Sequence, residues 1–578
     1  METFKLNILR WYRGGNESNR SMSSMESDRT LPPIGIINHS HQCCCTIEEL
    51  VKQNNEQPMV EAEGSNHLGM EGFVQSERRL QYNMLLLSLT SSIALGVVYT
   101  LISLDRYFYG RWTFLTLSAA FLFGALSVYY AQACVTRFGP NRVLGLATCA
   151  IIFYVLVHFS SNLILYQLGL IILAIWFGPF YAAQLEFIGY FSSRLIHLTK
   201  SIKRRHEERS HRLLHLLLFC PSHIVGHLIF VIIAALYGQT SSMNDNKNER
   251  IQRVHYHHQS IPQHIGTMKY SGATTTEWSD EWQSMTPSCL HQFQQQVCDH
   301  ALYYIFSFNR YQMSTNTDPS TNHIKPFTIN FTILLLSIFL LVVVSALIIV
   351  LLLLHRTEHL QVQDPLERGF LSSSIRNVLF RTFHDHHLRL LLPMAFFVGL
   401  EQGFFIADFN KLYVSCALGF DAIGLVMLTR GCVHLGATLL VHEFVRHIHR
   451  PLILLSGAIC QLGVLAILCL WRPNDDLPLY YVITACWALS NAIWETLLLT
   501  NILRTFCSEE WNYALLTVYS FISLGLSASF GISEFVCLYI KLYGMMAALV
   551  IAIIPMKVCE LRLLRLEKIL GPGSASQV

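Results

Sequence analysis

Ionisable side chains interrupt the apolar segments in the second half of this 578-residue chain. A charged side chain at the centre of a bilayer costs at least about 2.5–3.5 kcal/mol, so such residues usually have a function or a partner. One interpretation is a cation or proton site. The other, more common one is a buried ion network that fixes helix packing. The members of this predicted intramembrane polar cluster are Glu401, Asp408, Lys411, Arg430 and Glu495.

The spacing of these residues predicts which of them meet. Asp408 follows Glu401 by seven residues, so a regular helix would project both from one face. Lys411 lies about one turn beyond Asp408 and is expected to pair with it. Glu401 and Arg430 stand in the middle of two consecutive antiparallel segments, which predicts that they interact at similar depth. Nearby polar candidates are Gln402, Asn410, Asn491 and Asn501.

The elements that would hold these residues are membrane-spanning helices. The chain is 52% hydrophobic and 14% charged, whereas a soluble domain carries about 25% charged residues. The bilayer must therefore be part of the solvent. A helix needs about 20 mainly apolar residues to cross it. Twelve runs meet this need, at 82–104, 113–134, 143–159, 163–183, 213–237, 328–354, 390–414, 420–441, 452–470, 479–500, 512–533 and 537–556.

Lysine and arginine favour alternate connections between these runs. They gather after runs 2, 4, 6 and 8 and in the tail after run 12, which predicts that these connections and both termini are cytosolic. The opening of the chain has no apolar run of signal-peptide length. The first run, near Leu85, is therefore expected to act as the insertion signal.

Two tight basic turns indicate an internal repeat of six runs. Residues 136–142 join runs 2 and 3, and residues 443–450 join runs 8 and 9. The sequence thus predicts an all-α membrane protein, with twelve transmembrane helices in two six-helix bundles, as in the major facilitator superfamily. Its predicted parts are a mostly disordered cytosolic tail 1–80, a bundle 81–354 with an outer loop 238–327, a cytosolic linker 355–389, a bundle 390–556 and a cytosolic tail 557–578.

The polar segments carry three further candidates. Cys289 and Cys298 lie in the predicted outer loop, where thiols oxidise, and are expected to form a disulfide. The end of the chain, Ser576 to Val578, is a candidate ligand for a PDZ-domain protein, although such short motifs also arise by chance. Cysteines 43–45 are either palmitoylated or, more simply, reduced cytosolic thiols.

Enzymes and nucleic-acid binders are disfavoured. The chain has no nucleophile elbow, P-loop or HExxH motif, and a net charge of +3 is too small to indicate nucleic-acid binding. The histidine-rich stretches 255–258 and 384–387 could bind a metal, but solvated loop histidine is the simpler interpretation. We therefore predict a protein that is no enzyme and has neither a metal nor a cofactor.

One stretch carries a specific family resemblance. Residues 397–419, FVGLEQGFFIADFNKLYVSCALG, resemble the signature of the uncoordinated-93-like (UNC-93-like) family. Segments 470–478 and 535–543 support the match, and segment 178–184 is similar to that family's fourth helix. The chain departs from the family at 96–101, where an amide-rich stretch has become GVVYTL, and at Glu495, where the family tends to have an amide.

The resemblance implies a protein that acts on other membrane proteins. Family members look like transporters but regulate potassium channels or escort innate-immune receptors such as Toll-like receptors. We expect a potassium-channel regulator first and a receptor escort second, with the plasma membrane favoured over the endoplasmic reticulum and endosome. The rival class is a secondary transporter of a small solute or ion. A transporter needs polar groups in both halves of the cleft. The loss of amides at 97–101 argues against a transporter, whereas the charges in runs 7, 8 and 10 argue for one.

A patch of small residues in run 11 has two interpretations. It either approaches a partner helix or packs within the protein's own bundle, which is favoured. Its members are Gly525, Ser527, Ala528 and Ser529.

Overall fold

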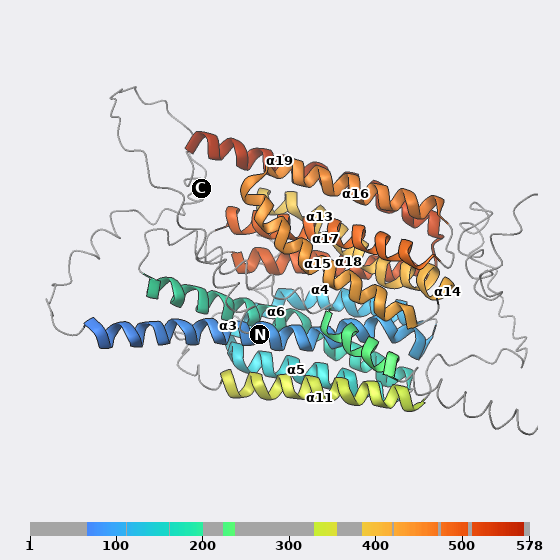
Figure 1. The fold of residues 1–578 in the computed structure, drawn as a ribbon, viewed down its shortest axis with the longest axis horizontal. Helices are drawn as coiled ribbons and strands as arrows, with labels where there is room; N and C mark the ends of the chain where they lie inside the picture. Colours follow the sequence, from blue (N-terminus) through green and yellow to red (C-terminus); the bar gives the residue numbers. More distant parts are fainter. Residues whose placement is uncertain are drawn as a thin grey trace, which may run out of the picture. The chain divides into compact units, whose positions relative to one another are not determined.

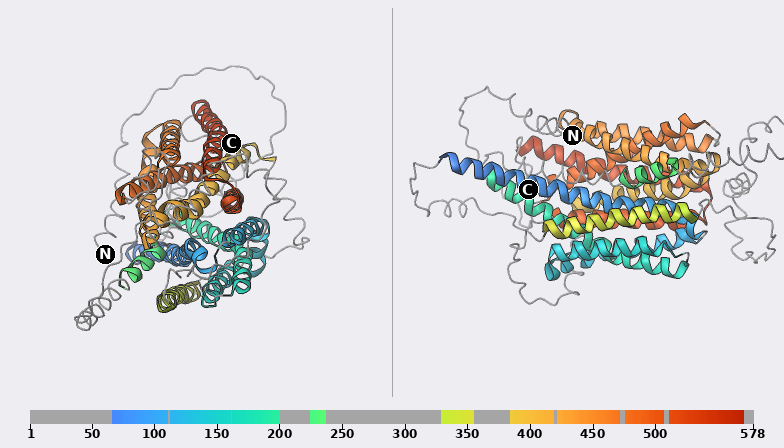
Figure 2. Two further views of the ribbon diagram at one scale, coloured as in Figure 1. Left: turned by 90° about the vertical axis from the view of Figure 1, so that its right-hand side faces the viewer. Right: turned by 60° about the horizontal axis from the view of Figure 1, so that its bottom comes forward.

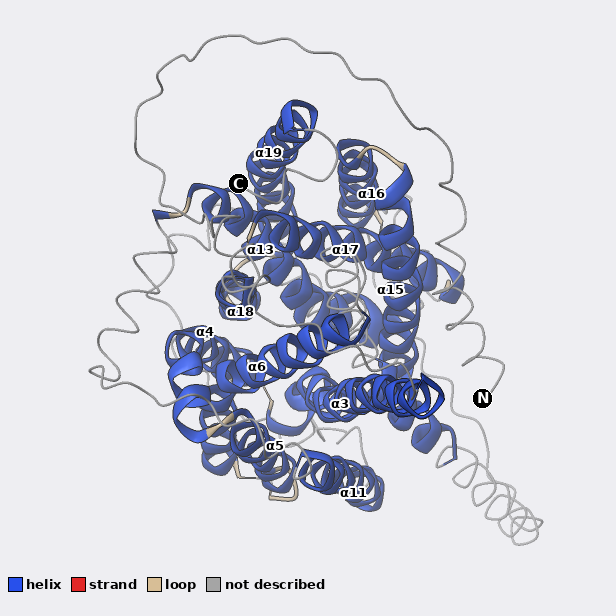
Figure 3. Ribbon diagram, turned by 90° about the vertical axis from the view of Figure 1, so that its left-hand side faces the viewer, coloured by secondary structure: helices blue, strands red, loops and turns tan. Residues whose placement is uncertain are grey.

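The chain is helical throughout the part that its computed structural model describes, and no strand occurs there (Figure 3). Described are residues 66–110, 112–160, 162–199, 224–236, 329–354, 384–418, 421–471, 476–506 and 511–570. Eleven of the described helices are long and apolar enough to cross a membrane. The predicted all-α membrane architecture is therefore confirmed, and eleven of the twelve predicted runs appear as full-length spans.

The helices of the first half pack mainly on one another (blue to yellow in Figure 1). α6 contacts α3, α4 and α5, while α11 lies against α3 and α5. Their bounds are α3 Asn66–Tyr109, α4 Thr113–Phe138, α5 Pro140–Val157, α6 Leu163–Thr199 and α11 Ile329–Leu354. The predicted fifth run appears as a shorter apolar helix, Ile224–Leu236, and the residues before it lie outside the described part.

The helices of the second half form the other packing group (orange to red in Figures 1 and 2). α13 contacts α17, α18 and α19, and α17 also contacts α15 and α16. The elements are α13 His386–Phe404, η3 Phe405–Val414, α14 Ser415–Ala417, α15 Asp421–His447, α16 Arg450–Leu470, α17 Leu477–Thr505, α18 Trp511–Ser533 and α19 Leu538–Leu570. α19 continues beyond the predicted end of run 12 at residue 556.

α18 joins the two groups, because it packs against α13 on one side and α4 on the other. The hydroxyl of Ser118 on α4 donates to the Ser527 carbonyl oxygen at 2.7 Å, and Ser527 donates back to the Ser118 carbonyl at 2.7 Å. Ser520 donates to the carbonyl of Ala125 at 3.0 Å. The small-residue patch of α18 therefore packs inside the protein, as its favoured interpretation predicted.

A π-helix, η3, interrupts the helix that follows the linker. It begins at Phe405, between Glu401 and Asp408, and ends at Val414. A π-helix bonds residue i to i+5 and turns less per residue than an α-helix. The expectation that Glu401 and Asp408 share one face, which assumed regular α-helix, is therefore wrong.

Several predicted features lie outside the described residues. These are most of the N-terminal tail, the outer loop with Cys289 and Cys298, the linker 355–383 and the C-terminal end with Ser576 and Val578. Their predictions stay predictions.

Candidate functional site

Polar side chains from three helices of the second half gather in the protein interior. Gln402 of α13 donates to Oε1 of Glu495 on α17 at 2.7 Å. Nε2 of His434 on α15 lies 3.2 Å from Oε2 of the same carboxylate. Glu401 and Arg430 stand beside them, as electrostatic neighbours of each other and of Glu495. We call these five residues the central polar cluster.

Glu401 is the least compensated member of the central polar cluster. It is fully buried, and neither carboxylate oxygen makes a hydrogen bond of good geometry among the described residues, although the Trp494 indole lies beside it. No ion pair within 4.0 Å joins it to Arg430, whose guanidinium lies 4.8 Å from the centre of the Phe405 ring. Glu401 and Arg430 are thus close enough to influence each other, and their predicted direct pairing stays a prediction.

The first half also reaches the central polar cluster, which sequence reasoning missed. Tyr99 of α3 is an electrostatic neighbour of Glu495 and Arg430, and it shares a hydrogen bond with Tyr181 of α6. Tyr181 in turn stacks on Tyr519 of α18, with 4.7 Å between the ring centres. Tyr99 belongs to the stretch that had lost its amides, so tyrosine hydroxyls stand where amides were expected.

The structure separates Asp408 and Lys411 from the central polar cluster and from each other. Asp408 accepts from Nζ of Lys541 on α19 at 2.6 Å and from the Ser533 hydroxyl at 3.0 Å. Lys411 instead donates to Glu534 at 3.2 Å. The expected pair between Asp408 and Lys411 is therefore corrected: the π-helix turns the two side chains toward different neighbours.

Glu534 also links the two halves of the chain. Its carboxylate accepts from the Arg106 guanidinium at the end of α3, as well as from Lys411 of η3. Arg106 additionally lies over the Phe114 ring, 5.1 Å from its centre. One carboxylate just beyond α18 thus holds cations from both packing groups.

We predict that Glu534→Gln destabilises the protein by about 1–3 kcal/mol, because it weakens two charge-assisted interactions at a mostly buried position. The control is Glu443→Gln, which removes a carboxylate whose i,i+4 partner His447 is largely exposed. Exposed pairs of this kind contribute less than about 1 kcal/mol. Thermal unfolding of purified protein in detergent measures both. An equal fall in the unfolding temperature of Glu534→Gln and Glu443→Gln would contradict the prediction.

A second buried charge, Asp105, was not predicted as a site residue. It accepts from the hydroxyls of Tyr154 at 2.6 Å and Tyr166 at 2.9 Å, and Nε2 of His158 lies 2.7 Å away. Nδ1 of His158 faces the Tyr154 carbonyl oxygen at 2.8 Å. Every oxygen of this carboxylate is engaged, so Asp105 ties α3, α5 and α6 together. Asp105 directly follows the predicted first run, which ends at residue 104, whereas the structure continues the span to Tyr109.

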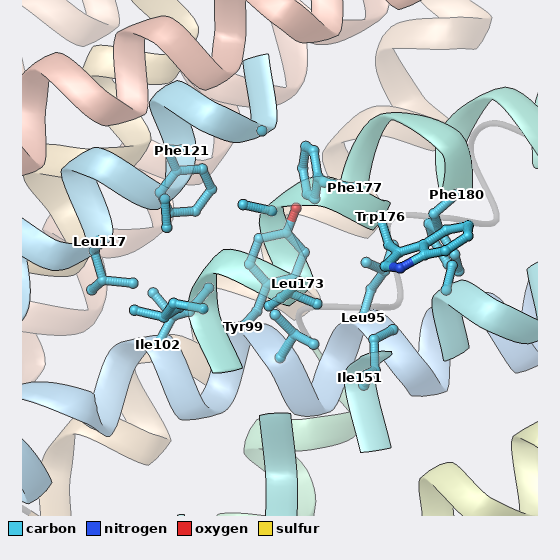
Figure 4. Close-up of a pocket in the computed structure, with 16 residues that line it drawn as sticks. Leu95, Tyr99, Ile102, Leu117, Phe121, Ile151, Leu173, Trp176, Phe177 and Phe180 are labelled. Carbon is cyan, nitrogen blue, oxygen red and sulfur yellow. The ribbon is translucent and has the colours of Figure 1, made fainter. Parts of the chain in front are cut away.

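An apolar cavity of about 50 Å³ lies within the first half, between α3, α4, α5 and α6 (Figure 4). Its lining is nearly all hydrocarbon and aromatic, for example Leu117, Phe121 and Trp176, and Tyr99 also lines it. Such a lining offers no partner to a charged ligand. The cavity therefore leaves the central polar cluster as the candidate site for ionic chemistry.

The described residues contain no group of three or more histidine, cysteine, aspartate or glutamate side chains that could hold a metal ion. Cys537, at the start of α19, is disulfide-bonded, and its partner lies outside the described side chains. This cysteine was not among the predicted disulfide residues.

Sequence comparison finds relatives but no matching family model. Protein unc-93 homolog A of Bos taurus is 32% identical over 172 residues, which cover 29% of this chain and 37% of that protein. The Xenopus laevis protein of the same name is 31% identical over 196 residues, covering 33% of this chain and 42% of that protein. The "putative potassium channel regulatory protein unc-93" of Caenorhabditis elegans is 29% identical over 126 residues, covering 22% and 18%.

The chain thus spans about two fifths of the length of the first two relatives. Among solved structures, an Escherichia coli fucose:proton symporter has a TM-score of 0.45 at 12% identity, covering 83% of this chain and 99% of that chain. A D-xylose-proton symporter has a TM-score of 0.47 at 11% identity, and the match covers 83% of this chain and 96% of that chain. TM-scores below 0.5 do not by themselves establish a common fold. Over the part of its length that the sequence relatives match, the chain is similar to proteins named unc-93 homolog A.

Proposed function

We propose that this protein regulates another membrane protein, with a potassium channel as the partner class. The proposal rests on one observation, the match to UNC-93-like proteins, one of which bears the name of a putative potassium channel regulator. We further propose that both termini are cytosolic, because lysine and arginine favour alternate connections. The proposed channel partner favours the plasma membrane as the place where the protein works.

Removing the protein from cells that express it should change potassium current density, while re-expression should restore the current. Whole-cell recording with a potassium-channel blocker measures this directly. An unchanged current combined with an altered surface level of a Toll-like receptor would overturn the channel proposal in favour of the receptor-escort role. Deleting the last three residues, which end in Val578, tests whether a PDZ-domain protein takes part.

A second candidate function, secondary transport, is favoured by a specific observation. Tyr99 and Tyr181 bring hydroxyls from the first half to the same place as Glu495 and Arg430 of the second. The polar groups that a transporter needs on both sides of its cleft are therefore present, although the amides are not. Purified protein in liposomes tests this function: gradient-driven, saturable solute uptake that Glu401→Gln abolishes without loss of folding would displace the regulatory proposal.

A further inference from the structure

The central polar cluster does not balance its own charge. When both are ionised, Glu401 and Glu495 contribute two negative charges, and Arg430 contributes one positive charge. The other buried charges nearby pair among themselves and not with this cluster: Asp408 pairs with Lys541, and Glu534 pairs with both Arg106 and Lys411, which leaves that second group one positive charge. With a neutral imidazole at His434, the central polar cluster keeps one net negative charge inside the membrane, which is unfavourable. One added monovalent cation would neutralise it.

The geometry of the cluster favours a proton as that cation. His434 is the one member that ordinarily titrates near neutral pH, and its Nε2 lies 3.2 Å from Glu495, where a proton between them would complete a hydrogen bond. A metal ion would instead have to sit beside the Arg430 guanidinium, which repels it. Glu401 and Glu495 lie near enough for a charge on one to affect the other.

Glu495 is the most exposed of the three titratable members Glu401, His434 and Glu495. The side chain of Glu495 is 31% exposed, whereas that of His434 is 6% exposed and Glu401 is fully buried. Glu495 is therefore the entry point for a proton, and Glu401 lies behind it. Other groups that face these three among the described residues are Tyr99 of α3, Tyr181 of α6, Gln402 of α13, Arg430 of α15 and Trp494 of α17.

We propose that the central polar cluster is a binding site for one proton, taken up through Glu495 and shared by His434, Glu495 and Glu401. The imidazole gains the proton on Nε2, the ion pair with Glu495 forms, and the net charge of the cluster falls to zero. This inference stands on the geometry of the cluster and does not depend on the regulatory partner. Its test is carried out on the isolated protein, so it can fail while the regulatory function holds.

Trp494 provides the readout, because its indole lies next to Glu401. The full chain in lipid nanodiscs is titrated from acid to alkaline pH at constant ionic strength, and intrinsic fluorescence is followed. The wild type should show a transition between about pH 5 and 8, the range in which histidine titrates. Trp494→Phe should remove most of the fluorescence change, and His434→Gln should remove the transition from this range.

Two substitutions should move the midpoint in opposite directions. Glu401→Gln removes a negative neighbour and should shift it to lower pH by about one unit or more. Arg430→Gln removes a positive neighbour and should shift it to higher pH. Opposite shifts are not expected from a role in packing alone. Where Arg430→Gln fails to fold, the shift in Glu401→Gln and the loss in His434→Gln decide the question.

Glu443→Gln is the matched control, because Glu443 also pairs with a histidine on α15, but its side chain is 39% exposed whereas Glu401 is fully buried. Its midpoint should equal that of the wild type. A transition that persists in His434→Gln, or one that Glu443→Gln shifts as much as Glu401→Gln, would overturn the proposal. So would a fluorescence change that follows sodium or potassium concentration at fixed pH, because it would make a metal cation the ligand.

Discussion

Lys541→Met should destabilise the protein by about 3–5 kcal/mol, the usual cost of leaving one member of a buried ion pair unpaired. Lys541 and Asp408 are both buried, and Nζ donates to Oδ1 at 2.6 Å. Removal of the lysine leaves the Asp408 carboxylate with the Ser533 hydroxyl as its hydrogen-bond donor among the described residues. The double change Lys541→Met with Asp408→Asn removes the stranded charge and should recover part of the loss.

Denaturant or thermal unfolding in a mild detergent measures this difference between single and double variants. Lys557→Met is the control, since Lys557 lies on the same helix, α19, with an exposed side chain. Surface substitutions of this kind are usually within about 0.5 kcal/mol of the wild type. If the effects of Lys541→Met and Asp408→Asn simply add in the double variant, Asp408 and Lys541 do not stabilise each other and the prediction fails.

The Asp408–Lys541 pair also shows what the sequence could not predict, namely which buried charges meet. The hydropathy pattern predicted both spans correctly. A helix that crosses the bilayer satisfies its backbone hydrogen bonds within one segment, and that segment must be a continuous apolar run, which the sequence shows directly. Which charges meet depends on helix rotation and on contacts between distant segments. The π-helix from Phe405 to Val414 shifts the side-chain register, and no spacing rule for regular helices anticipates it.

The same dependence on contacts between distant segments explains why some partners at the candidate site were not predicted. The residue types at Glu401, Arg430 and Glu495 were enough to predict a polar cluster, and the three lie near one another. Tyr99 and Tyr181 were missed because a tyrosine in an apolar run usually serves packing, and only the contact between halves shows where its hydroxyl lies. Asp105 was missed as a site residue because its partners come from helices that the sequence does not place together.

Gly399→Val and Gly525→Val should each abolish most of the folded yield. α13 and α18 cross so closely that a Cβ at Gly399 would overlap the Ile522 carbonyl oxygen, and one at Gly525 would overlap that of Phe396. These neighbours are backbone atoms, so no rotamer change relieves the overlap and the helices must separate. Overpacking usually costs about 1–3 kcal/mol where side chains can move, and more is expected here.

Gly436→Val and Gly463→Val are the matched controls. Both glycines lie in spanning helices of the same half, α15 and α16, and a Cβ at either would meet nothing within 4 Å. The loss of backbone freedom is the same in all four variants, so only the crossing of α13 and α18 distinguishes them. Size-exclusion profiles of the four detergent-extracted variants provide the comparison. Monodisperse Gly399→Val protein at wild-type yield would mean that α13 and α18 do not approach as closely as the structure shows.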